Sequence, residues 1–159
     1  MDGGRRGDST HMNVQTTRFG VVDLDERRII TFPGGLLGFS SYTRFALLQP
    51  DDEGVFFWLQ SLESPELAFV VTDPALWVRD YQAAIRREQM DELTLDTLDD
   101  AQVFVIVNKY GRALTANLQG PLVINLKNHT AMQLVLADKR WNTRHEIVNL
   151  GEAVHAASA

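Results

Sequence analysis

The sequence predicts an all-β fold: a mainly antiparallel, β-barrel-like single domain with one or two short helices. Two observations predict it. Apolar runs with strand character recur at short spacing, and Gly, Pro, Asn or Asp stands between most of them. The length of 159 residues fits one domain, which we place at residues 13–150. Short strands separated by turn residues at this spacing are typical of an antiparallel sandwich or barrel.

The two ends of the chain lie outside this domain. Residues 1–12 are predicted to be a disordered leader or an expression remnant, because they lack a hydrophobic period before Met12. Residues 151–159 are predicted to be a flexible C-terminal tail. No apolar run approaches the roughly 18 residues of a membrane-spanning helix, and the N-terminus lacks the apolar core of a signal peptide. We therefore expect a cytoplasmic protein with no membrane partner.

Strand character and turn residues place the strands in order along the chain. The expected strands are 14–24, 28–32, 44–49, 55–61, 67–72, 103–109, 112–118, 121–126, 132–137 and a last candidate at 144–149. The strands around residues 56–59 and 103–107 are apolar on both faces, so we expect both faces to be covered. Gly38, in the turn after the second strand, is expected to need a positive φ. Gly111 is expected to supply the left-handed residue of a hairpin between residues 103 and 118.

The stretch from residue 73 to residue 100 has two interpretations. Asp73 and Pro74 form a good helix start, with Asp as the cap and Pro at the first helical position. Residues spaced by three to four then favour a continuous helix to about Met90. Tyr81, Ala83 and Ile85, however, alternate with other residues at the strand period. The stretch is therefore either one helix or a short helix followed by a strand.

Residues 115–125 form the most informative segment. Two short apolar runs flank a break at Gly120 and Pro121, which predicts a hairpin-like element. Gly120 can adopt the positive φ of a tight bend, and Pro121 suits the first residue of a strand. Asn117 and Asn125 lie in runs that otherwise have strand character. An amide in a strand is costly unless its hydrogen bonds are satisfied, either inside the fold or by a partner.

No motif points to catalysis or to a bound metal or cofactor. The four histidines have no metal-ligand spacing, and cysteine is absent. The glycines at 34, 35 and 38 match neither a dinucleotide-binding fingerprint nor a phosphate-binding loop. The net charge of −6 opposes binding to nucleic-acid phosphates. We interpret the basic stretch 139–142 as a solvated turn or as a local contact for an acidic partner. We expect a monomeric, non-enzymatic protein that requires no cofactor and favours a basic protein partner.

Four motif segments, in one order, resemble the flagellar assembly factor FliW family. They are Phe32-Pro-Gly-Gly-Leu-Leu-Gly-Phe39, Leu59-Gln-Ser61, Leu67-Ala-Phe-Val-Val71 and the segment at 115–125. The resemblance covers roughly residues 13 to 150. It implies a small β-barrel-like protein that binds two proteins: cytoplasmic flagellin and the RNA-binding translational repressor CsrA. In that scheme, flagellin export frees the protein to bind CsrA, so that translation of flagellin matches its secretion.

The sequence offers only candidates for the docking surfaces. They are motif positions and exposed acidic residues: Phe39, Asp51, Asp52, Glu53, Gln60, Asp91, Glu92 and Asn117. Leu36, Leu37 and Trp77 are further apolar candidates, for each of which a place in the core is the favoured interpretation. Two other functions stay open. One is a flagellin chaperone without an RNA-level role, and the other is a ligand-binding barrel of unknown specificity.

Overall fold

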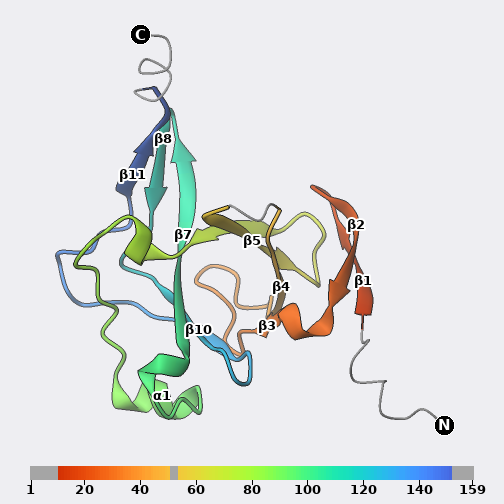
Figure 1. The fold of residues 1–159 in the computed structure, drawn as a ribbon, viewed down its shortest axis with the longest axis horizontal. Helices are drawn as coiled ribbons and strands as arrows, with labels where there is room; N and C mark the ends of the chain where they lie inside the picture. Colours follow the sequence, from red (N-terminus) through yellow and green to blue (C-terminus); the bar gives the residue numbers. More distant parts are fainter. Residues whose placement is uncertain (1–10, 51–53, 152–159) are drawn as a thin grey trace.

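The computed structural model describes residues 11–50 and 54–151. Within them the chain forms eleven strands, one α-helix and three short 3₁₀ helices (Figure 1). The strands are β1 (His11–Thr16), β2 (Gly20–Asp25), β3 (Ile29–Thr31), β4 (Arg44–Leu48), β5 (Phe56–Ser61), β6 (Ala68–Thr72), β7 (Ala101–Tyr110), β8 (Ala113–Ala116), β9 (Leu122–Asn125), β10 (Ala131–Gln133) and β11 (His145–Asn149). The helices are η2 (Glu26–Arg28), η3 (Pro74–Leu76), α1 (Arg87–Glu92) and η4 (Leu98–Asp100).

Nine of the strands form one antiparallel sheet, which confirms the predicted fold class. Its order is β10-β9-β7-β6-β5-β4-β3, with β8 pairing to β7 and β11 pairing to β8. The two ends of this order meet at an isolated bridge between Thr31 and Thr130, where the Thr31 N–H donates to the carbonyl of His129 at 3.0 Å. The sheet therefore curls back on itself, but no ladder of paired residues closes it into a barrel.

The ten-residue strand β7 organises the second half of the chain. Val107 pairs with Ala116 of β8, and Phe104 pairs with Leu122 of β9. Both strands therefore run antiparallel to the same edge of β7, and residues 117–121 bulge out between them. The prediction of a hairpin at 115–125 was wrong, because β8 and β9 pair with β7 and not with each other. Local turn residues could not reveal a shared distant partner.

The glycine positions divide into two groups. Gly38 and Gly111 have φ values of +83° and +61°, as predicted. Gly120 was predicted to use a positive φ and does not. A Cβ atom at residue 120 would lie 2.9 Å from Nε2 of Gln133 and 3.0 Å from Nδ2 of Asn117. Gly120 therefore leaves room for these two side-chain amides and does not serve a left-handed backbone.

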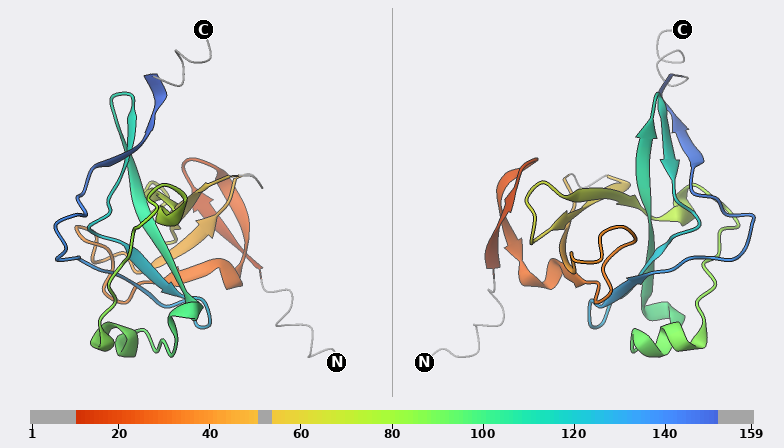
Figure 2. Two further views of the ribbon diagram at one scale, coloured as in Figure 1. Left: turned by 60° about the vertical axis from the view of Figure 1, so that its left-hand side comes forward. Right: turned by 180° about the vertical axis from the view of Figure 1, so that it is seen from behind.

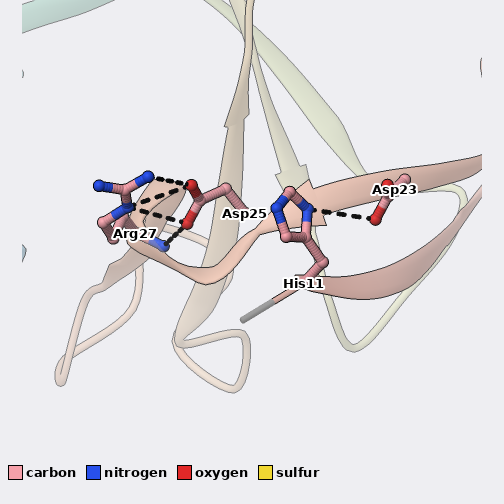
Figure 3. Close-up of polar contacts among 4 residues, drawn as sticks. All are labelled: His11, Asp23, Asp25 and Arg27. Carbon is pink, nitrogen blue, oxygen red and sulfur yellow. Dashed lines mark hydrogen bonds and ion pairs between the residues drawn. The ribbon is translucent and has the colours of Figure 1, made fainter. Parts of the chain in front are cut away.

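The N-terminal strands form a separate hairpin beside the main sheet (Figure 1). A single strand at 14–24 was expected, but a turn divides it into β1 and β2, and His11 and Met12 belong to β1 and not to the leader. The His11 imidazole lies 3.4 Å from the Asp23 carboxylate, and Figure 3 shows the two side chains facing each other. At the end of β2, hydrogen bonds from Arg27 hold the pKa of Asp25 well below its usual range. Both contacts lie at the surface, where such pairs contribute little to stability.

The segment between β6 and β7 follows neither interpretation of the sequence. Asp73 caps η3 and Pro74 begins it, as predicted, but the helix ends after one turn. Residues 79–86 are then assigned neither helix nor strand, and α1 begins only at Arg87. Thr94, with φ of +55°, ends that helix, and the Leu95 N–H donates to the Met90 carbonyl across the turn. A continuous helix to Met90 and a paired strand were therefore both wrong.

Three clusters of buried apolar side chains form the core. Their fully or almost fully buried members include Phe32 and Phe45 in the first, Leu93 and Leu118 in the second, and Val14 and Leu24 in the third, which lies under the β1–β2 hairpin. The strands expected to be covered on both faces are so covered. Phe57 of β5 contacts Phe104 of β7 with ring centroids 5.4 Å apart, and Phe56 stacks on Trp77 at 5.7 Å. Side chains from other parts of the chain thus cover both faces of β5.

Candidate protein-docking surface

The bulge at residues 117–121 joins segments that are distant in sequence. The Asn117 Oδ1 accepts hydrogen bonds from the backbone N–H groups of Gln119 (3.2 Å) and Gly120 (3.0 Å). The amide of Asn117 therefore shapes its own turn, and the structural interpretation of this residue is the better one. From the other side, the Tyr81 hydroxyl donates to the Leu118 carbonyl at 2.7 Å, and burial raises the pKa of that hydroxyl.

Gln133 connects the bulge to the glycine-rich turn. Its Nε2 donates to the Gly120 carbonyl at 3.0 Å, and its Oε1 accepts from the Leu37 N–H at 2.8 Å. One side chain thus joins two motif segments that are about 80 residues apart in the chain. Sequence reasoning missed Gln133. The available signal was the one that marked Asn117: an amide in an otherwise apolar, strand-like run.

The glycine-rich turn divides its bulky residues between core and surface. Leu36 is 2% exposed and belongs to the first core cluster, so it is not a surface candidate. Leu37 is 63% exposed, and Phe39 is 37% exposed. The Phe39 ring packs edge-on against Phe69, with centroids 5.2 Å apart. Phe39 and Leu37 can therefore meet a partner, although Phe39 also supports the turn.

Gln60 is completely buried and cannot contact a partner directly. Its Nε2 lies 3.1–3.3 Å from four backbone carbonyl oxygens, those of Ser61, Ser64, Pro65 and Leu67. The side chain therefore holds the loop that connects β5 to β6. Its Oε1 has no hydrogen-bond partner among the described residues.

The acidic candidates fall in two places. Asp51, Asp52 and Glu53 lie outside the described residues. Asp91 and Glu92 are exposed at the end of α1, where Asp91 lies 3.8 Å from Arg87. Glu92 forms no ion pair within the described part of the chain. It lines a hollow of about 350 Å³ together with Leu37, Gln133 and the backbone of the glycine-rich turn.

Two other candidate features, the basic stretch 139–142 and Trp77, each include a ring that packs within the fold. Trp141, in the basic stretch at 139–142, is only 7% exposed, and its ring packs on Tyr81. Arg140 pairs with Asp138 at 2.8 Å, so this stretch is a solvated turn around a buried ring, as interpreted. The Trp77 indole N–H donates to the Thr72 hydroxyl at 3.0 Å and contributes to packing. No helix in residues 11–50 and 54–151 is long and apolar enough to cross a membrane.

The sequence that contains these segments matches a known family. The model of the FliW protein family matches residues 13–147, which include all four motif segments and the bulge that joins them. The chain belongs to the FliW family. The FliW resemblance proposed from the sequence is confirmed.

Similar proteins agree with the family assignment. A flagellar assembly factor FliW from Treponema denticola is 41% identical over 139 residues, covering 86% of this chain and 94% of that relative. One from Geobacter sulfurreducens is 43% identical over 136 residues, covering 84% and 85%. A crystal structure of the flagellar assembly factor FliW superposes with a TM-score of 0.79 at 29% identity, covering 86% of this chain and 97% of that one. The FliW fold therefore covers 86% of the chain.

Proposed function

We propose that this protein is a cytoplasmic flagellar assembly factor that acts by binding proteins and not by catalysis. It binds unsecreted flagellin and, once export has removed flagellin, binds CsrA and prevents it from repressing flagellin mRNA. The observation that carries the proposal is the FliW family match over residues 13–147, with curated relatives that are named flagellar assembly factors. The partners themselves follow from the family resemblance.

The charge of the chain supports the proposed CsrA partner. A net charge of −6 steers a basic RNA-binding protein toward the complex and places negative potential near the path of RNA phosphates. Thermodynamic linkage makes the antagonism mutual. If the protein weakens RNA binding to CsrA by a coupling of about 1–3 kcal/mol, RNA weakens its own binding to CsrA equally.

The exposed apolar groups support the proposed flagellin partner. Segments that are disordered before assembly bind by burying apolar side chains in grooves or by adding a strand to a free sheet edge. Leu37 and Phe39 offer apolar surface of this kind beside the hollow that Glu92 lines. The test is affinity capture with purified flagellin and purified CsrA, each applied separately. Capture of both supports the proposal, whereas capture of flagellin alone favours a chaperone without an RNA-level role.

The acidic residues are expected to act on the rate of encounter. Changing Asp51, Asp52 and Glu53 together to lysine should slow association with CsrA, and more at low salt than at high salt, because exposed charges act mainly through long-range steering. Stopped-flow association rates across a salt series measure this. An association rate that responds to neither the reversal nor the salt would show that these residues only confer solubility.

A further inference from the structure

Three of the four motif segments meet around one small hollow at the surface. This aromatic hollow has a volume of about 230 Å³ and is lined by Phe39, Tyr42, Ser64, Glu66 and Leu67. The first two residues come from the connection between β3 and β4, and the other three come from the connection between β5 and β6. The right-hand view of Figure 2 shows the first of these connections, in orange, in front of the sheet.

The motif segment at 59–61 holds one side of the aromatic hollow in place. The Gln60 Nε2 lies 3.3 Å from the carbonyl oxygen of Ser64 and 3.2 Å from that of Leu67. The Ser61 Oγ accepts hydrogen bonds from the N–H groups of Glu63 and Ser64, both at 3.0 Å. Because these bonds form within the chain, the loop is ordered before any partner arrives, which lowers the entropic cost of binding there.

The other side of the aromatic hollow carries two rings. The centroids of Phe39 and Tyr42 are 6.4 Å apart and the ring planes are inclined at 53°, so the two rings do not stack on each other. Phe39 is 37% exposed although its ring also packs on Phe69, and Tyr42 is half-buried. The faces of such rings carry partial negative charge and attract cations.

The polar groups of the aromatic hollow lack partners within the chain. The hydroxyl groups of Tyr42 and Ser64 form no hydrogen bond among the described residues. Glu66 is exposed, and its carboxylate forms no ion pair there either. The neighbouring Glu63 differs, because its Oε1 accepts a hydrogen bond from the Thr43 N–H at 3.0 Å. Glu66 is therefore the acid of this loop that is left for a partner.

These groups together select a cation of side-chain size. Residues 39–44 and 61–67 contain one basic residue, Arg44, and two acidic ones, Glu63 and Glu66, which gives a net charge of −1. Two ring faces, two hydroxyl oxygens and a carboxylate favour a positively charged donor and repel a carboxylate. The volume of about 230 Å³ is below the roughly 300–1,000 Å³ of a small-molecule site, so it suits one side chain.

We propose that the aromatic hollow seats one lysine or arginine side chain of CsrA, the basic one of the two proposed partners. The inference rests on the proposed function, because it assigns a surface to one partner. The cationic group lies against the rings of Phe39 and Tyr42 and forms an ion pair with Glu66. Phe39 also belongs to the exposed apolar surface proposed for flagellin. A seated side chain covers part of that surface, so the two complexes exclude each other here.

Glu66→Gln tests the ion pair, since glutamine keeps the shape of the side chain and removes its charge. The complex with CsrA is expected to weaken by about threefold to tenfold, mainly through faster dissociation, because a seated charge acts after docking. Glu146→Gln is the matched control: it removes the same charge at an exposed position on β11 and should leave dissociation unchanged. Stopped-flow mixing measures association and dissociation rates separately.

Phe39→Leu tests the ring, since leucine keeps an apolar side chain and removes the aromatic face. The complex with CsrA should weaken by about threefold or more, while the complex with monomeric flagellin changes by less than about twofold. Urea unfolding of each variant precedes the rate measurements, because Phe39 packs on Phe69. Glu66 is exposed, so Glu66→Gln keeps the test intact if Phe39→Leu fails to fold.

The outcomes separate the aromatic hollow from the proposed function. Faster dissociation of CsrA from the Glu66→Gln variant, with flagellin binding unchanged, supports the hollow. A CsrA complex that dissociates at the same rate with and without the Glu66 charge overturns the hollow and leaves the proposed function standing. Equal weakening of the flagellin complex overturns the assignment to CsrA. Absence of any complex with either folded partner overturns the proposed function itself.

Discussion

Gly35→Ala is expected to lower the free energy of unfolding by about 2–5 kcal/mol, from a left-handed backbone and from overpacking together. Gly35 has φ of +68°, a conformation that disfavours any side chain. A Cβ atom there would also lie 2.5 Å from Cα of Ser40 and 2.7 Å from the carbonyl oxygen of Phe39. Because these are backbone atoms, the turn itself would have to move.

Gly38→Ala is the matched control for that prediction. Gly38 lies three residues away with φ of +83°, but a Cβ atom there would meet no atom within 4 Å. The free energy of unfolding of the Gly38→Ala variant should fall by only about 1–2 kcal/mol, which is the cost of a left-handed backbone at alanine. Urea unfolding of both variants measures the difference. Equal losses of unfolding free energy in the two variants would contradict the close approach of the backbone at Ser40 to Gly35.

Gln60→Glu is expected to destabilise the protein by about 3–5 kcal/mol at pH 7, because it buries an unpaired charge. The Nε2 position of Gln60 faces four carbonyl oxygens at 3.1–3.3 Å, which would repel a carboxylate oxygen. Burial and these oxygens raise the pKa of the introduced carboxyl in the folded state above its unfolded value of about 4.3. The loss of unfolding free energy relative to the unsubstituted protein should therefore be small below about pH 4 and grow as the pH rises.

Gln60→Leu separates the charge from the loss of the hydrogen bonds. It removes the donor without adding charge, so it should cost about 1–3 kcal/mol, with a difference from the unsubstituted protein that does not vary with pH. Chemical unfolding of both variants between pH 4 and pH 8 makes the comparison. If Gln60→Glu and Gln60→Leu lowered the free energy of unfolding equally across that pH range, the convergence of four carbonyl oxygens on residue 60 would be contradicted.

Local pattern predicted most of the strands because each apolar run with its flanking turn residues is a local feature. The start of η3 at Asp73 and Pro74 and the left-handed Gly111 were predictable for the same reason. What failed depends on distant partners. Residues 117–121 form a bulge only because β8 and β9 share one edge of β7. Residues 79–86 have the strand period, but no strand pairs with them in the described part of the chain.

The candidate site was predictable in part, for a related reason. The motif segments at 32–39 and 115–125 do lie together, joined by hydrogen bonds from Gln133. Which of the candidate polar residues face outward depends on burial that spacing cannot reveal. Asn117 and Gln60 satisfy backbone groups inside the fold, whereas Glu92 faces a hollow and has no ion pair in the described residues.

The central claim is that flagellin and CsrA bind this protein in mutually exclusive complexes, and a competition experiment tests it most directly. Monomeric flagellin is added to a preformed complex with CsrA, and all three proteins are followed by size-exclusion chromatography. The account predicts that CsrA leaves the complex as flagellin enters it, with no peak that contains all three. A stable ternary complex, or failure of the folded protein to bind either partner, would contradict the account.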